Sequence, residues 1–158
     1  MFAIRLINPT DGPMGEEPGW RGFAQPRLQA DRPPLNATAL LALLVAVWHL
    51  PLVLLPEFDL RPIDLLTTAC VTFFYAWLFN RSGGSVLMTL VAHATEGSIN
   101  TGEFWTEGAA EARMEWLYAL VWSAVAVGLV IVDRRCWRRY APKEARVEPV
   151  PARDRAGG

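Results

Sequence analysis

The sequence predicts an all-α fold: a polytopic bundle of about four transmembrane helices, with one further helix at the membrane surface. Two observations support this prediction. Hydrophobic residues make up 52% of the 158 residues, and they occur in long blocks separated by polar segments. The only two histidines, His49 and His93, are inside these blocks, where an ionisable side chain is costly and marks a candidate functional site.

The first fifteen residues contain several helix breakers and no long apolar core, so no cleavable signal peptide is predicted. An amphipathic helix is expected from Pro18 to Gln29, with a break at Pro26. Its aromatic residues Trp20 and Phe23 suit the apolar side of the membrane boundary, and its arginines suit lipid headgroups. The segment is therefore predicted to be an interfacial helix.

Four apolar spans follow, with expected bounds 36–56, 63–79, 85–99 and 116–132. Pro51 is expected to kink or end the first span. The third span is the weakest and carries His93 and Glu96. An acidic loop is expected between the last two spans, from Asn100 to Glu115. Residues 1–133 then form one membrane domain, and residues 134–158 form a basic tail without stable structure.

The distribution of arginines predicts the orientation. If the four spans alternate, one side receives Arg21, Arg27, Arg32, Arg81, Arg134, Arg135, Arg138 and Arg139. The other side receives only Arg61 and Arg113, beside several acids. The C-terminus is therefore expected to be cytoplasmic. The net charge of −1 argues against a nucleic-acid partner, which leaves the lipid bilayer and membrane-associated molecules.

The segment before the first span carries two adjacent carboxylates and an arginine. Glu17 and Arg21 are four residues apart, so on a helix they share a face and can pair. Glu16 is rotated by roughly 100° from Glu17 and remains free. Such a split gives two acids different roles. The alternative interpretation is that these acids precede a helix with Pro18 in its first turn, where they favour the helix dipole.

The histidines are far from the expected ends of their helices. His49 is about 20 Å from Asn36, and His93 is about 13 Å from Gly84, at roughly 1.5 Å per residue. Neither side chain can reach the membrane surface, so both are candidates for a buried site. The alternative is that each forms a packing hydrogen bond with a neighbouring helix.

These residues resemble the motifs of the CPBP family of intramembrane proteases, which includes the type II CAAX prenyl endopeptidases and relatives of lysostaphin resistance protein A (Abi family). Glu16-Glu17-x-x-x-Arg21, in the context Gly19-Trp20-Arg21-Gly22, is similar to the first motif. His49 ends a second motif, FxxxH, although Val45 replaces the phenylalanine. His93 begins a third motif, HxxxN, but Gly97 replaces the asparagine, and Asn100 is a doubtful substitute.

The resemblance implies a bacterial integral membrane protein, N-terminally shortened relative to the family, that cleaves a CAAX-type or other membrane-associated peptide. In the family, the residues matching Glu16 and His49 activate water, and those matching His93 and Gly97 stabilise the oxyanion. Glu17 and Arg21 complete the motif. Because glycine offers no donor, a weak enzyme is expected, and Gly97→Asn is expected to raise turnover.

Two mechanisms stay open. Glu16 could act as a general base without a metal, or Glu16, His49 and His93 could bind zinc and lower the pKa of a bound water. No HExxH motif is present. Other classes of function also remain: a non-catalytic immunity or scaffold protein with the same fold, or part of a transporter.

Overall fold

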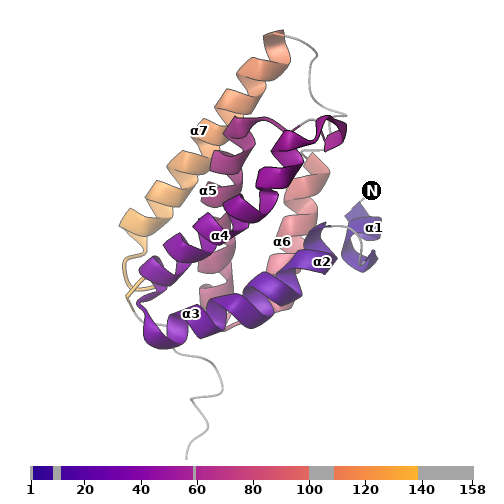
Figure 1. Cartoon of the computed structure of the whole chain (residues 1–158). Coiled ribbons are helices and arrows are strands. Elements are labelled where there is room, and N and C mark those ends of the chain that lie inside the picture. Colours follow the sequence, from indigo (N-terminus) through magenta and orange to yellow (C-terminus); the bar gives the residue numbers. More distant parts are fainter. Residues whose placement is uncertain (1, 9–11, 59, 100–108, 139–158) are drawn as a thin grey trace, which may run out of the picture.

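The computed structural model of the chain describes residues 2–8, 12–58, 60–99 and 109–138. Within these ranges every regular element is a helix, which confirms the predicted fold class (Figure 1). The expectations for Asn100, for most of the acidic loop and for most of the basic tail concern residues outside these ranges. The elements are α1 (Phe2–Ile7), α2 (Gly12–Gly19), the π-helical turn η1 (Trp20–Ala24), α3 (Gln25–Asp31), α4 (Pro34–Leu54), the 3-10 turn η2 (Pro56–Phe58), α5 (Pro62–Arg81), α6 (Val86–Ile99) and α7 (Ala109–Val132).

Three of the described helices are long and apolar enough to cross a membrane: Pro34–Leu54, Pro62–Arg81 and Ala110–Val132. The chain is therefore an integral membrane protein. Helix α6 matches the bounds of the predicted third span, 85–99, to within one residue, but its 14 described residues are too few for a membrane crossing. Its length of about 21 Å, at roughly 1.5 Å per residue, is less than the hydrocarbon thickness of a bilayer. Within the described residues, the count of candidate spans is thus three rather than four.

Helix α5 is the centre of the bundle and packs against α4, α6 and α7 (Figure 1). Its buried face carries small and weakly polar residues, including Thr67, Thr72 and Ala76. The Thr72 hydroxyl donates to the Thr68 carbonyl at 2.9 Å, so the threonine can be buried among apolar helices without an unsatisfied polar group. The outer face of α7 exposes a row of large apolar side chains, as expected for a lipid-facing surface: Leu117, Leu120, Val121, Val127 and Ile131.

The surface helix is longer than predicted and has no break at Pro26. Helical structure continues from Gly12 to Asp31, through α2, η1 and α3 (Figure 1). In the wide η1 turn, the Gln25 amide donates to the Trp20 carbonyl, five residues earlier. A π turn of this kind gives the ring of Pro26 room that an α-helical turn would not. The Gln25 side chain donates to the Ala76 carbonyl of α5 at 3.3 Å, which fixes the surface helix to the bundle.

Helix α7 begins at Ala109, seven residues before the start expected at Trp116. The expected loop residues Glu111 and Glu115 therefore lie one helical turn apart. Arg61, just before α5, pairs with both carboxylates, at 3.4 Å from Glu111 and 2.9 Å from Glu115. Because Arg61 neutralises the charges of Glu111 and Glu115, this acidic segment can form the first turns of α7 instead of a loop.

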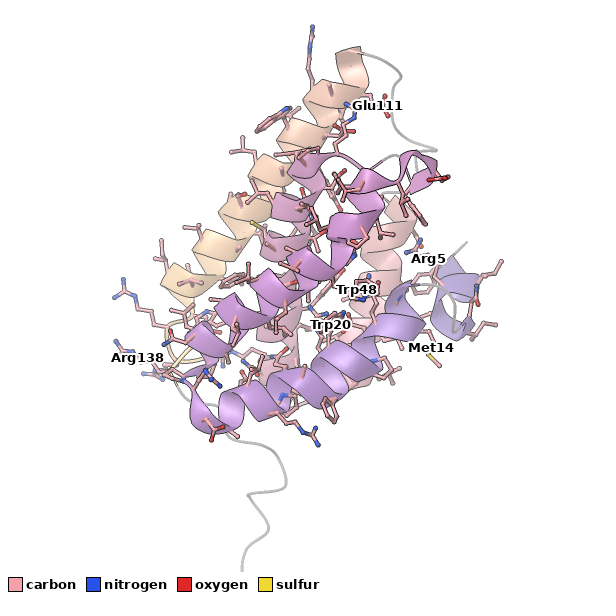
Figure 2. The ribbon with its side chains drawn as sticks, viewed as in Figure 1. Arg5, Met14, Trp20, Trp48, Glu111 and Arg138 are labelled. Carbon is pink, nitrogen blue, oxygen red and sulfur yellow. The ribbon has the colours of Figure 1, made fainter. Side chains whose placement is uncertain are left out.

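The arrangement of the helix ends allows a test of the orientation. Figure 2 shows Glu111 and Arg138 at opposite ends of the bundle, and the arginine-rich segment after α7 is at the Arg138 end. A reporter fused after Arg138 is expected to be cytoplasmic, and one inserted beside Glu57 is expected to be external, because arginines are retained on the cytoplasmic side. Alkaline phosphatase and green fluorescent protein fusions would measure both positions. An external Arg138 fusion would contradict the orientation.

Candidate functional site

The first motif forms a buried ion pair. Glu17 and Arg21 are 0% and 2% exposed, and Arg21 Nη1 donates to Glu17 Oε1 at 2.9 Å. The spacing predicted this pair. Both residues are far from the start of α2, so the alternative interpretation of an acidic helix N-terminus is wrong for the described helix. Burial alone raises the pKa of the Glu17 carboxyl, but the Arg21 guanidinium and the His93 ring together outweigh burial and lower this pKa below its ordinary value.

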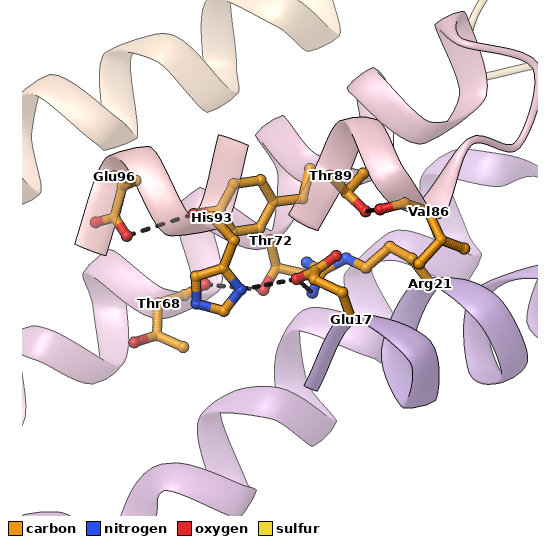
Figure 3. Close-up of polar contacts among 9 residues, drawn as sticks. Glu17, Arg21, Thr68, Thr72, Val86, Thr89, His93 and Glu96 are labelled. Carbon is orange, nitrogen blue, oxygen red and sulfur yellow. Dashed lines mark hydrogen bonds and ion pairs between the residues drawn. The ribbon is translucent and has the colours of Figure 1, made fainter. Parts of the chain in front are cut away.

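Glu17 also orients the second histidine. The same oxygen, Glu17 Oε1, accepts a hydrogen bond of 2.9 Å from His93 Nδ1 (Figure 3). Because an ionised carboxylate only accepts, Nδ1 carries the hydrogen and Nε2 faces away from Glu17. A Cβ atom on Gly12 would lie 3.6 Å from His93 Nε2 and 2.9 Å from Glu16 Oε1. Glu16 and His93 therefore converge where Gly12 has no side chain.

His49 is oriented through its own helix. Its Nδ1 lies 2.9 Å from the Val45 carbonyl, and since a carbonyl only accepts, Nδ1 is the donor and Nε2 remains available. The neighbouring Trp48 meets Trp20 of η1 edge-on, with ring centroids 6.1 Å apart (Figure 2). This aromatic contact holds α4 against the surface helix, beside the histidine.

A cavity of about 430 Å³ joins these residues. Its wall includes Glu16, Arg21, His49 and His93, which come from the surface helix, α4 and α6. Four of the five residues singled out in the sequence thus line one cavity. The fifth, Glu17, is completely buried and contacts the wall residues Arg21 and His93.

Each histidine, taken singly, is oriented as a metal ligand usually is, but the described residues do not bring three ligands together. Each has Nδ1 bonded to an oxygen acceptor, as metal-bound histidines usually do, which leaves Nε2 for a ligand. Among the described residues, no three His, Cys, Asp or Glu side chains are close enough together to hold a metal ion.

Three further residues of the site were not predicted from the sequence. The Tyr75 ring stacks on His93, with centroids 5.1 Å apart, and the Arg21 guanidinium carbon lies 4.9 Å from the Tyr75 centroid. The hydroxyls of Tyr75 and Tyr118 both donate to Glu96. Glu96 had a sequence signal, because it is an ionisable residue inside an apolar segment. The tyrosines had none, since their partners are 21 and 22 positions away.

Position 97 also differs from expectation. A Cβ atom on Gly97 would lie 2.4 Å from Arg5 Nη2 and 2.7 Å from Arg5 Cζ. The Arg5 guanidinium from α1 thus fills the space in which an asparagine side chain was expected to fit. An asparagine there would have to displace the end of the flexible Arg5 side chain, and the effect of Gly97→Asn on turnover stays a prediction.

Comparison with known proteins identifies one family. The family model described as type II CAAX prenyl endopeptidase Rce1-like matches residues 2–98, which include the surface helix, α4, α5 and nearly all of α6. No significant match was found among curated proteins or among solved structures. The matched range contains Glu16, Glu17, Arg21, His49 and His93.

Proposed function

Since the chain belongs to the Rce1-like family of type II CAAX prenyl endopeptidases, we propose that it hydrolyses a peptide bond of a membrane-associated substrate within the cavity. The convergence of Glu16 and His93 beside Gly12, in a cavity that His49 also lines, is the observation that supports this function. A base, a water-positioning ring and a donor for the oxyanion are what amide hydrolysis requires.

We assign Glu16 as the general base. Its carboxylate takes a proton from a water held by His49 Nε2, and the water oxygen attacks the carbonyl carbon of the substrate. His93, held by Glu17 through Nδ1, donates from Nε2 to the oxyanion. When the C–N bond breaks, Glu16 returns the proton to the leaving nitrogen. Arg21 keeps Glu17 ionised and supports the Tyr75 ring beneath His93.

Zinc would lower the pKa of the attacking water. The candidate ligands are the Glu16 carboxylate and Nε2 of His49 and His93, but in the described arrangement these three groups are not close enough together to hold one ion. The roles of Glu17, Arg21 and Tyr75 as positioning residues are the same with or without the metal, because each acts on the orientation of His93.

The proposed substrate is a prenylated CAAX-type protein or another membrane-associated peptide, and the proposed location is the bacterial cell membrane with the C-terminus in the cytoplasm. A non-catalytic immunity or scaffold protein is the second candidate. The observation that favours it is Gly97, because position 97 offers no side-chain donor to an oxyanion and is instead packed against Arg5.

A cleavage assay separates the two candidates. Purified protein in detergent or liposomes is incubated with a farnesylated CAAX peptide and with an unprenylated membrane-bound peptide, and products are identified by mass spectrometry. Cleavage that zinc chelation abolishes and zinc restores would support the metal route. Cleavage that chelation leaves unchanged would support Glu16 acting alone. Absence of cleavage of both peptides by folded protein would overturn the protease function.

A further inference from the structure

The proposed mechanism leaves one carboxylate of the cavity wall without a role, Glu96. It lies in α6, three residues after His93, and both residues line the cavity. Residues three apart on a helix have Cβ atoms roughly 5–6 Å apart on the same face. Glu96 is therefore on the same face of α6 as His93, at a spacing of about two residues along an extended peptide.

The carboxylate is fixed from two sides. Tyr75 donates to Oε2 at 3.3 Å, and Tyr118 donates to Oε1. Tyr75 is 3% exposed and is held between Arg21 and His93, so it cannot move away easily. Because both hydroxyls donate, Glu96 needs no proton of its own and presents a negative charge to the cavity.

Each of the other acids in the cavity wall has either a partner in the structure or a role in the proposed mechanism. Glu111 and Glu115 pair with Arg61, and Asp64 accepts from the Arg61 backbone amide at the start of α5. Glu16 is the proposed base. Among the described residues, no lysine or arginine forms an ion pair with Glu96.

A fixed carboxylate without an ion pair among the described residues is expensive inside a membrane bundle. It is tolerated where the charge has a use, and its complement here is a cation that enters the cavity. We propose that Glu96, held by Tyr75 and Tyr118, is the binding site for a basic side chain of the substrate, a lysine or an arginine close to the cleaved bond. This inference rests on the proposed function and assigns a substrate preference to the same cavity.

The test uses pairs of lipid-anchored fluorescent peptides that differ at one position. One peptide of each pair has lysine there, and the other has the uncharged norleucine. Successive pairs place this position at different points along the peptide. Binding to the full-length protein is measured by fluorescence anisotropy, and cleavage is measured separately. For at least one position, the lysine peptide is expected to bind about tenfold or more tightly than its twin. In Glu96→Gln this ratio is expected to fall close to one.

The matched control is Glu57→Gln, the same chemical change at an exposed position on η2, which is expected to keep the wild-type ratio. Thermal unfolding of each variant checks that it is folded. Equal binding of the twins by the wild type, or an unchanged ratio in folded Glu96→Gln, would overturn the inference. Because binding is measured without cleavage, an inactive protein that still prefers lysine through Glu96 would refute the protease function and retain the cation site.

Discussion

Replacement of Glu16 by glutamine is expected to lower peptide cleavage by at least about a hundredfold, because general acid–base catalysis typically contributes about 10²–10⁴-fold. Glutamine has nearly the same volume as glutamate and keeps a carbonyl oxygen near Gly12, but it cannot take a proton from water. Glu16 is only partly buried and has no ion-pair partner among the described residues, so the fold should be retained. Initial rates on one peptide substrate, together with the thermal midpoint, measure both effects.

Glu57→Gln serves as the control, since it makes the same change on the exposed surface of η2. It is expected to keep both the rate and the midpoint. A Glu16→Gln enzyme with the wild-type rate would refute the assignment of Glu16 as the base, whatever the metal content of the protein.

The Glu17–Arg21 pair is expected to contribute the largest effect on stability. Both side chains are almost inaccessible to solvent, and removal of one partner of a buried pair typically costs about 3–5 kcal/mol. Glu17→Gln should lower the free energy of unfolding by an amount in this range, because the Arg21 guanidinium remains buried without its counter-charge. It should also slow cleavage, since His93 loses the carboxylate that orients it.

A double-mutant cycle isolates the pair. The double variant Glu17→Gln/Arg21→Gln is expected to be less destabilised than the sum of the single variants, because neither charge is then left alone. Arg27→Gln is the control: Arg27 is exposed and lies over the Phe23 ring of its own helix, so its loss should have little effect. Additive single effects in denaturant unfolding would show that the two residues do not stabilise each other.

The same pair predicts an acid dependence of stability. The folded-state pKa of Glu17 is below its ordinary value of 4.5, so the ionised form stabilises the fold. This contribution is complete at neutral pH and is lost as the pH falls below 4.5 towards the folded-state pKa. Glu17→Gln should therefore lose less stability than the wild type over this acid range. Parallel losses in the two proteins would contradict the lowered pKa.

Much of the site could be predicted because its signals are local. Glu17 and Arg21 are four residues apart, so any helix through them brings the two charges together. His49 and His93 are conspicuous because apolar segments rarely carry ionisable residues without a function. The all-α membrane fold follows from the apolar blocks, since a lipid-embedded backbone must satisfy its own hydrogen bonds.

The errors arose where distant residues decide the local structure. The start of α7 could not be read from Glu111 and Glu115, because the arginine that neutralises them is about fifty positions away, before α5. The expected break at Pro26 is absent because the preceding π turn, η1, leaves room for the proline ring. Position 97 was considered only as the place of a missing donor, and the spacing gave no sign that the distant Arg5 side chain packs against Gly97.

The sequence by itself determined that this protein is a helical membrane protein in which Glu17 pairs with Arg21 and two histidines are inside apolar segments, because apolar blocks and four-residue spacings act over a single helix. Only the tertiary structure decided which groups meet. It brings His93 to Glu17 across 76 positions and two tyrosines to Glu96. Such contacts depend on how α2, α5, α6 and α7 pack, and no spacing within one helix encodes the angle and depth at which it meets another.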